Sequence, residues 1–182
     1  MKNYLTSDTH FGHYNIIKYC NRPFKSVEEM NEKLIHNWNE IVKPEDLVHF
    51  LGDFCFRNSP GGNQGEPFKY EYYASKLNGN ITFYLGNHDS NSALKTKLIS
   101  GVVRFANQNF WLIHNPAYAN PDYEINIVGH VHDAFRIKQI EIKGKKTIVY
   151  NVSTDVHNFR PITFDKVITD ISKWRKNGCK DT

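Results

Sequence analysis

Five short polar segments, each placed directly after a run of apolar residues, constrain this chain more than any other feature. Apolar, β-branched and aromatic runs bounded by Gly, Asn and Asp are typical of buried strands. Ligands of open α/β sheets bind beyond the carboxyl ends of the strands, so we expect the segments to meet there. The segments are Asp8-Thr9-His10, Gly52-Asp53, Gly86-Asn87-His88-Asp89, His114-Asn115-Pro116 and Gly129-His130-Val131-His132.

The side chains of these segments are suitable ligands for divalent metals. They supply carboxylates, an amide oxygen and imidazoles, and none of them is a thiol. This donor set favours borderline or hard ions such as manganese, iron, zinc and nickel over copper(I) or an iron–sulfur cluster. Calcium would need more oxygen ligands. We therefore predict two divalent metal ions in each chain, with manganese as the first choice.

In this order, the segments resemble the signature of the calcineurin-like metallophosphoesterase superfamily, which reads D-x-H, G-D, G-N-H-[D/E], H and G-H-x-H. All five blocks are present between Asp8 and His132. An ordered match of several blocks is much more specific than any single block. The flanking stretches, Ser7 to His13, Cys20 to Phe24 and Asp155 to Pro161, are similar to a compact branch of the superfamily found in bacteria and phages.

The resemblance implies an α/β fold, a four-layer sandwich of two mixed β-sheets flanked by helices. With 182 residues the chain can bury one substantial core, so we predict a single domain over residues 1–182. A capping box at Ser26-Val27-Glu28-Glu29 begins an amphipathic helix that ends at Ile41. Further helices are expected over residues 68–77, after Asp89 and over residues 165–177, and a β-hairpin over residues 137–152.

The resemblance also implies which residues hold the metals. One metal would be bound by Asp8, His10, Asp53 and His132. Asp53 would bridge to a second metal, bound also by Asn87, His114 and His130. Metals roughly 3.5–4 Å apart bind phosphate oxygens and activate a bridging water for in-line attack.

Two further residues of the third segment receive catalytic roles from the resemblance. His88 would lie on the leaving-group side of the phosphate, as a general acid or as a stabiliser of charge. Asp89 would orient the His88 ring and fix its tautomer.

Each candidate for contact with substrate also has an ordinary structural interpretation. An arginine matches two phosphate oxygens with its planar fork, but an arginine in a loop is usually solvated. His13 either reaches the substrate or caps the helix that follows it. Asn151 and Asp155 either support the metal-bound histidines or form a turn. His157 is either a functional residue or a hydrogen-bonded structural one. The predicted substrate-binding residues are Asn87, His13, Arg22, Arg57 and Arg160.

Composition limits the class of protein. The net charge of +4 is modest, and no basic stripe suggests a partner such as long duplex nucleic acid. No apolar stretch approaches the ~20 residues that span a bilayer, and Met1 to Tyr4 leads directly into the first strand, so we expect a cytoplasmic protein. Cys20, Cys55 and Cys179 do not form a disulfide framework.

These patterns together predict a dinuclear metal-dependent phosphoesterase acting on a small phosphoester, including a nucleotide-derived one. Diesters are preferred over monoesters because compact branches of the superfamily often act on them. The alternatives are a non-catalytic metal-dependent protein-binding scaffold, and a phosphomonoesterase or nuclease of the same superfamily. Tyr118 and Tyr123 lie near the expected rim of the site, where they either stack on a substrate ring or pack the loop. The oligomeric state is not fixed by these patterns.

Overall fold

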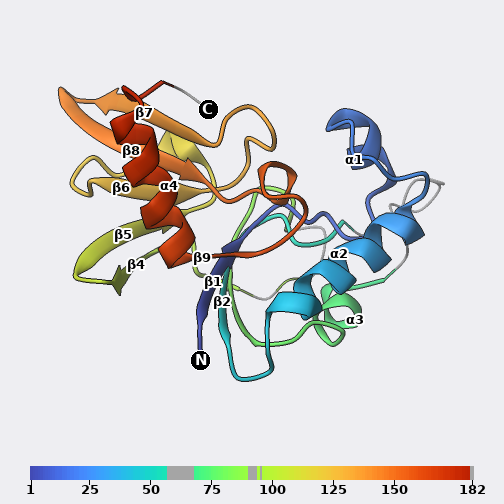
Figure 1. The fold of residues 1–182 in the computed structure, drawn as a ribbon. Helices are drawn as coiled ribbons and strands as arrows, with labels where there is room; N and C mark the ends of the chain where they lie inside the picture. Colours follow the sequence, from blue (N-terminus) through green and yellow to red (C-terminus); the bar gives the residue numbers. More distant parts are fainter. Residues whose placement is uncertain (57–67, 90–93, 95, 181–182) are drawn as a thin grey trace.

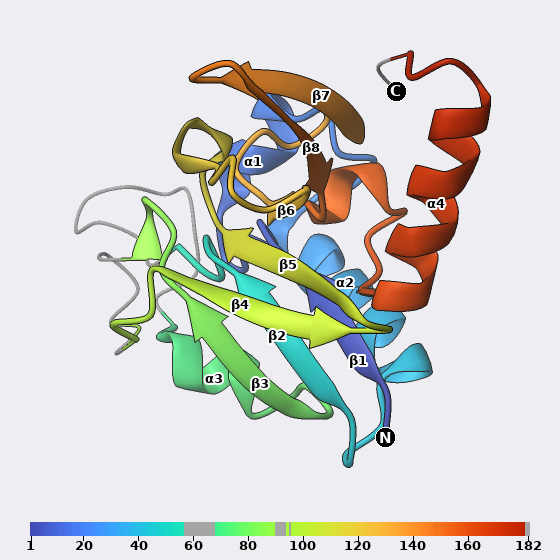
Figure 2. The ribbon, with the colours of Figure 1, turned by 90° about the vertical axis from the view of Figure 1, so that its left-hand side faces the viewer.

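A four-stranded sheet carries the first three polar segments. The computed structural model describes residues 1–56, 68–89, 94 and 96–180. In this sheet the strand order is β3-β2-β1-β9, with β1, β2 and β9 labelled in Figure 1 and β3 beside β2 in Figure 2. The first three strands are parallel to one another, and β9 is antiparallel to β1. The strands are β1 (Asn3–Thr6), β2 (Leu47–Leu51), β3 (Asn80–Tyr84) and β9 (Ile162–Thr163).

A five-stranded sheet carries the other two segments. Its order is β4-β5-β6-β8-β7, with β6 parallel to both of its neighbours and antiparallel pairs at the two edges. The pair β7 and β8 is the predicted hairpin, which is thereby confirmed. The strands are β4 (Ser100–Phe105), β5 (Gln108–Ile113), β6 (Ile125–Val128), β7 (Ile137–Ile142) and β8 (Lys145–Asn151).

The two long helices agree closely with the sequence, since the helix predicted to end at Ile41 ends there and the one predicted over residues 165–177 covers residues 164–176. Ser26 accepts a hydrogen bond from the Glu29 backbone N–H at the start of α2, although the Glu29 carboxylate binds the Lys25 N–H instead of completing the box. The helix predicted over residues 68–77 is shorter, and the one predicted after Asp89 lies outside the described residues. No helix among the described residues has the length and apolar character needed to cross a membrane. The α-helices are α1 (Tyr14–Tyr19), α2 (Val27–Ile41), α3 (Tyr70–Ala74) and α4 (Phe164–Lys176).

Three apolar clusters hold these layers together. The largest lies between the two sheets and includes the buried face of α4. A second joins the other face of the first sheet to α1, α2 and α3. A smaller third one lies on the far face of the second sheet, and among the described residues no α-helix contributes to it. The predicted α/β class with two mixed sheets and flanking helices is confirmed, with the helices gathered mainly on the first sheet (Figure 2).

Phe164 connects both sheets to α4. Its side chain is fully buried, and its ring centroid lies 6.0 Å from that of His49 on β2, 5.2 Å from Phe105 on β4 and 5.2 Å from Phe110 on β5. A ring in this position aligns the first turn of the helix with both layers. Phe164 is therefore a large contributor to the apolar cluster that joins α4 to the two sheets.

We predict that Phe164→Ala lowers the free energy of unfolding by about 3–5 kcal/mol, because it removes a buried ring and leaves a cavity between the sheets. Urea unfolding followed by circular dichroism measures this change. Tyr19→Ala is the control, since Tyr19 is 71% exposed and should change stability by no more than about 0.5 kcal/mol. Equal stability of the two variants would contradict the role given to Phe164.

Candidate metal centre

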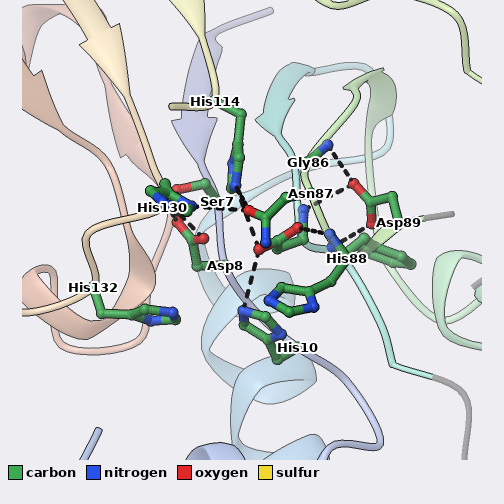
Figure 3. Close-up of polar contacts among 12 residues, drawn as sticks. Ser7, Asp8, His10, Gly86, Asn87, His88, Asp89, His114, His130 and His132 are labelled. Atoms are coloured by element: carbon green, nitrogen blue, oxygen red, sulfur yellow. Dashed lines mark hydrogen bonds and ion pairs between the residues drawn. The ribbon is translucent and has the colours of Figure 1, made fainter. Parts of the chain in front are cut away.

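The five polar segments meet at one edge of the molecule, as the sequence predicts. The Asp8 backbone N–H donates to the Gly52 carbonyl at 3.0 Å, which joins the ends of β1 and β2. The Gly129 N–H donates to the His114 carbonyl at 2.9 Å, which joins the ends of β5 and β6. The His130 N–H donates to the Asp8 carboxylate at 2.9 Å and connects the two sheets (Figure 3). Residues far apart in sequence therefore form one cluster.

Backbone conformation at this edge is unusual. Five predicted metal ligands have φ between +48° and +72°, a backbone region that residues other than glycine seldom adopt. Such residues cost on the order of 1–3 kcal/mol each and persist where their surroundings fix them. Further non-glycine residues with positive φ lie in turns elsewhere, but these five lie together where the side chains converge. The five residues are Asp8, His10, Asp53, His130 and His132.

A first group of donors is formed by Asp8, His10 and His132, whose donor atoms lie within 4.8 Å of one another. Asp8 and His10 are buried. Both ring nitrogens of His10 are buried without a hydrogen-bond partner. A buried polar group left unpaired costs about 1–3 kcal/mol, and a metal ion at a nitrogen would remove that cost. The donor set therefore fits a divalent ion.

A second group is formed by Asp53, His114 and His130, again with donor atoms within 4.8 Å. The oxygen of the Asn87 side chain lies 2.9 Å from Nε2 of His114 and 2.8 Å from Nδ1 of His130. Nδ1 of His114 is hydrogen-bonded to the Leu51 carbonyl at 2.7 Å, so Nε2 is the nitrogen directed into the group. All four predicted ligands of the second metal are thus brought together.

Asp53 lies between the two groups. Its Oδ2 is 3.6 Å from Nε2 of His10 and 3.4 Å from Nε2 of His114. Its Oδ1 accepts the His88 backbone N–H at 2.8 Å. One oxygen is therefore held by the backbone while the other faces both groups, which is the arrangement expected of a bridging carboxylate.

Charges within the cluster compensate one another. Burial alone would raise the pKa of the Asp53 carboxyl, but hydrogen bonding and charge from His114 outweigh it and hold that pKa below its usual range. Burial alone would lower the pKa of His114, but Asp53 and Asp8 raise it to about 9. The pKa of His10 is lowered by burial, which favours the neutral imidazole that binds metals. The cluster thus suits a cation in both charge and donor type.

Two glycines bring the carboxylates close to the loops. A Cβ atom at Gly86 would lie 2.2 Å from Oδ1 of Asp53, and one at Gly129 would lie 2.6 Å from Oδ2 of Asp8. These distances are shorter than any van der Waals contact, so only glycine fits. The glycines of the third and fifth segments are explained by this approach, since neither has a positive φ.

His88 lies beside both groups and belongs to neither of them. Its ring is exposed, and the ring centroid is 5.6 Å from that of His10. The Asp89 carboxylate accepts hydrogen bonds from the backbone N–H groups of Asp53, Phe54 and Gly86. The observed role of Asp89 is therefore to hold the loops after β2 and β3 together, and its predicted contact with the His88 ring stays a prediction.

Asp155 supports a metal ligand, which favours one of the two interpretations open from the sequence. Its Oδ2 lies 2.8 Å from Nδ1 of His132, so it orients that ring. Arg22 donates to both carboxylate oxygens of Asp155, at 2.7 and 3.0 Å, and to the backbone carbonyls of Asp8 and Thr9. This buried guanidinium is fully engaged, which contradicts its predicted contact with phosphate.

The other predicted substrate contacts are placed as follows. Arg160 pairs with Glu40 at 2.7 Å, beside a separate cavity, and this does not support its contact with phosphate. Arg57 lies outside the described residues. The ring of His13 stacks on Phe56 with centroids 4.3 Å apart, and His13 occupies the N-cap position of α1 without a capping hydrogen bond from its side chain. Nε2 of His157 lies 2.8 Å from the Asn151 carbonyl, a structural position.

Two residues near the cluster were missed from the sequence. The Ser7 hydroxyl donates to Oδ2 of Asp8. The Cys20 thiol lies within 4.8 Å of donor atoms on His132 and Asp155. Ser7 directly precedes the first polar segment, which was a usable signal, whereas nothing in the sequence around Cys20 indicated its approach to His132. All three cysteines are free, as predicted.

The chain is similar to several known proteins. An uncharacterized protein of Methanocaldococcus jannaschii, MJ1445, is 39% identical over 176 residues, which cover 94% of this chain and 92% of that protein. The Gene 66 protein of Mycobacterium phage L5 is 31% identical over 86 residues, 47% of this chain and 39% of that protein. The crystal structure of AQ665, a protein of unknown function from Aquifex aeolicus, has a TM-score of 0.67 at 23% identity and covers 92% of this chain and 98% of its own. That similarity supports the fold.

A family model that matches nearly the whole chain identifies the family. The model of the family described as calcineurin-like phosphoesterase matches residues 1–180. This range includes all five polar segments and both donor groups. The family implies a phosphoesterase that uses divalent metal ions, and the donor groups supply residues to hold such ions. The chain belongs to the calcineurin-like phosphoesterase family.

Proposed function

We propose that the protein hydrolyses phosphodiester bonds at a centre of two divalent metal ions. The observation that carries this proposal is the position of Asp53 between two groups of metal donors. Its Oδ2 lies 3.6 Å from Nε2 of His10, which belongs to the first donor group, and 3.4 Å from Nε2 of His114, which belongs to the second. A carboxylate placed between two cations reduces their mutual repulsion.

The donor sets assign residues to each ion. Imidazole, carboxylate and amide donors without a thiolate suit manganese, and also iron, zinc or nickel. When bound, such a pair of ions coordinates phosphate oxygens and lowers the pKa of a bound water. One ion would be held by Asp8, His10 and His132, the other by His114, His130 and Asn87, and Asp53 would be shared.

His88 is assigned to the departing alcohol. Hydrolysis forms a bond from water oxygen to phosphorus and breaks the bond from phosphorus to the alcohol oxygen, which then needs a proton. The exposed ring of His88 is fixed at its base by the hydrogen bond from its backbone N–H to Asp53. A ring nitrogen of His88 would donate the proton to the alcohol oxygen as a general acid.

The placement of the arginines supports a diester over a monoester. A phosphomonoester carries a charge of about −1.5 to −2 near pH 7, and a diester carries a single negative charge. Arg22 is engaged with Asp155, and Arg160 is paired with Glu40. Neither is available to neutralise the additional charge of a monoester.

The first test measures hydrolysis of bis-p-nitrophenyl phosphate and p-nitrophenyl phosphate by protein stripped of metal and then refilled with manganese. We expect turnover only after refilling, faster with the diester, and none with Asp53→Asn. A faster monoester reaction would overturn the diester assignment. Two bound metals without any turnover would favour the alternative of a metal-dependent scaffold.

His88→Ala should keep both metals and lower kcat by about 10²–10⁴, the usual contribution of a positioned general acid. Metal content is measured by elemental analysis and kcat with the diester. The matched control is His36→Ala, because His36 is an exposed histidine on α2. Full activity of His88→Ala would remove this residue from the proposed reaction.

Asp155→Asn should weaken metal binding by about 10–100-fold, because removing a carboxylate that orients a ligating histidine has effects of this size. Calorimetric titration of the metal-free protein with manganese measures the affinity. Asp122→Asn is the control, since Asp122 is exposed and pairs with Lys145. Unchanged affinity in Asp155→Asn would show that its contact with His132 does not matter for the metal.

A further inference from the structure

A cavity of about 250 Å³ opens directly beside the second donor group. Two of its lining residues, Asn87 and His114, belong to the proposed metal site. The rest of its lining is mainly apolar and comes from both sheets and from the loop after β5. The other lining residues are Leu85, Gly86, Ile99, Ile113, Asn115 and Tyr118.

Large apolar side chains are exposed around this cavity. Ile99 is 62% exposed and Tyr118 is 70% exposed, and both line it. Exposed apolar groups that gather beside polar functional groups are typical of a ligand-binding site. The exposed side chains of Tyr118 and Ile99 therefore form an apolar surface suited to contact with a ligand.

The cavity walls are held by the backbone. Leu85 N–H donates to the Leu98 carbonyl at 2.8 Å, which fixes the segment before β4 against the end of β3. Asn115 caps the short helix η2 (Pro116–Tyr118) by accepting the Ala117 N–H at 2.9 Å, and the Tyr118 N–H donates to the Asn115 carbonyl. Tyr118 is thus presented by a fixed turn directly after the metal ligand His114.

The two tyrosines of this loop have different roles. Tyr123 stacks on Trp111 with centroids 5.3 Å apart and packs the loop onto β5. Tyr118 keeps its ring at the cavity. Of the interpretations left open by the sequence, packing therefore applies to Tyr123, while Tyr118 is available to a substrate ring.

We propose that this cavity binds the organic group of the substrate, and that this group is a planar aromatic ring, such as a phenyl group or a nucleobase. The inference rests on the proposed function, because the phosphate must lie at the donor groups for its substituent to reach the cavity. A cavity of about 150 Å³ already accepts benzene, so the volume suits one ring system. Tyr118 supplies the aromatic surface for offset or edge-to-face contact with that ring.

Phenylphosphonate and methylphosphonate test this assignment, because they share a non-hydrolysable charged head group and differ in the ring. Their dissociation constants are measured by calorimetry with the manganese-loaded protein. We expect phenylphosphonate to bind about tenfold more tightly, the factor that one good aromatic contact provides. Tyr118→Ala should abolish this preference by weakening phenylphosphonate alone, and Tyr118→Phe should retain it.

The control is Tyr72→Ala, which removes an exposed tyrosine from α3 and should keep the preference. Retained binding of methylphosphonate by Tyr118→Ala shows that this variant is folded and that its metal centre is intact. Equal affinity of the wild-type protein for both phosphonates would overturn the ring subsite and leave the proposed function standing. A preference that survives in Tyr118→Ala would also overturn it. Binding of neither compound would overturn the ring subsite, and turnover of bis-p-nitrophenyl phosphate would then decide the proposed function on its own.

Discussion

The hydrogen bond from the His130 backbone N–H to the Asp8 carboxylate is the contact on which the metal centre depends. Asp8 follows β1 of the first sheet, and His130 follows β6 of the second. Neither sheet alone contains a complete donor group, because each group combines residues from both. The apolar core between the sheets therefore determines the geometry of the site, and the stability of that core and the function of the site are linked.

The site also stores unfavourable energy that the free protein must offset elsewhere. Five predicted ligand residues have left-handed backbone conformations, and within the described residues neither nitrogen of the buried His10 ring has a hydrogen-bond partner. Each of these features costs on the order of 1–3 kcal/mol. Such costs are large compared with the net stability of a domain, about 5–15 kcal/mol. The extensive packing of α4 and of both sheets is what allows this strained edge to persist.

Much of the site could be predicted because its residues lie in short segments that follow one another in a recognisable order. The convergence of the strand ends followed from the apolar runs before the segments, and the seven predicted metal ligands followed from the resemblance of those segments to the family signature. The ion pairs of Arg22 and Arg160 could not be predicted, because they depend on which carboxylate the fold places beside each guanidinium. Asp155 reaches His132 and Arg22 across 23 and 133 residues of sequence, and no local pattern encodes such a contact. The helix lengths followed the apolar pattern in α2 and α4, whereas α3 is shorter than predicted although Leu77 beyond its end still packs in the cluster with α2.

The glycines of the third and fifth polar segments use the same physical device. Gly86 lies against Asp53, whose Oδ1 accepts the His88 N–H, and Gly129 lies against Asp8, which accepts the His130 N–H. In each case a loop approaches a carboxylate at a distance that excludes a side chain, and a backbone N–H then fixes the orientation of that carboxylate. Because the backbone occupies Oδ1 of Asp53, Oδ2 stays directed at His10 and His114. The glycines therefore act on the metal centre through the carboxylates, which explains in physical terms why each precedes a ligand in the chain.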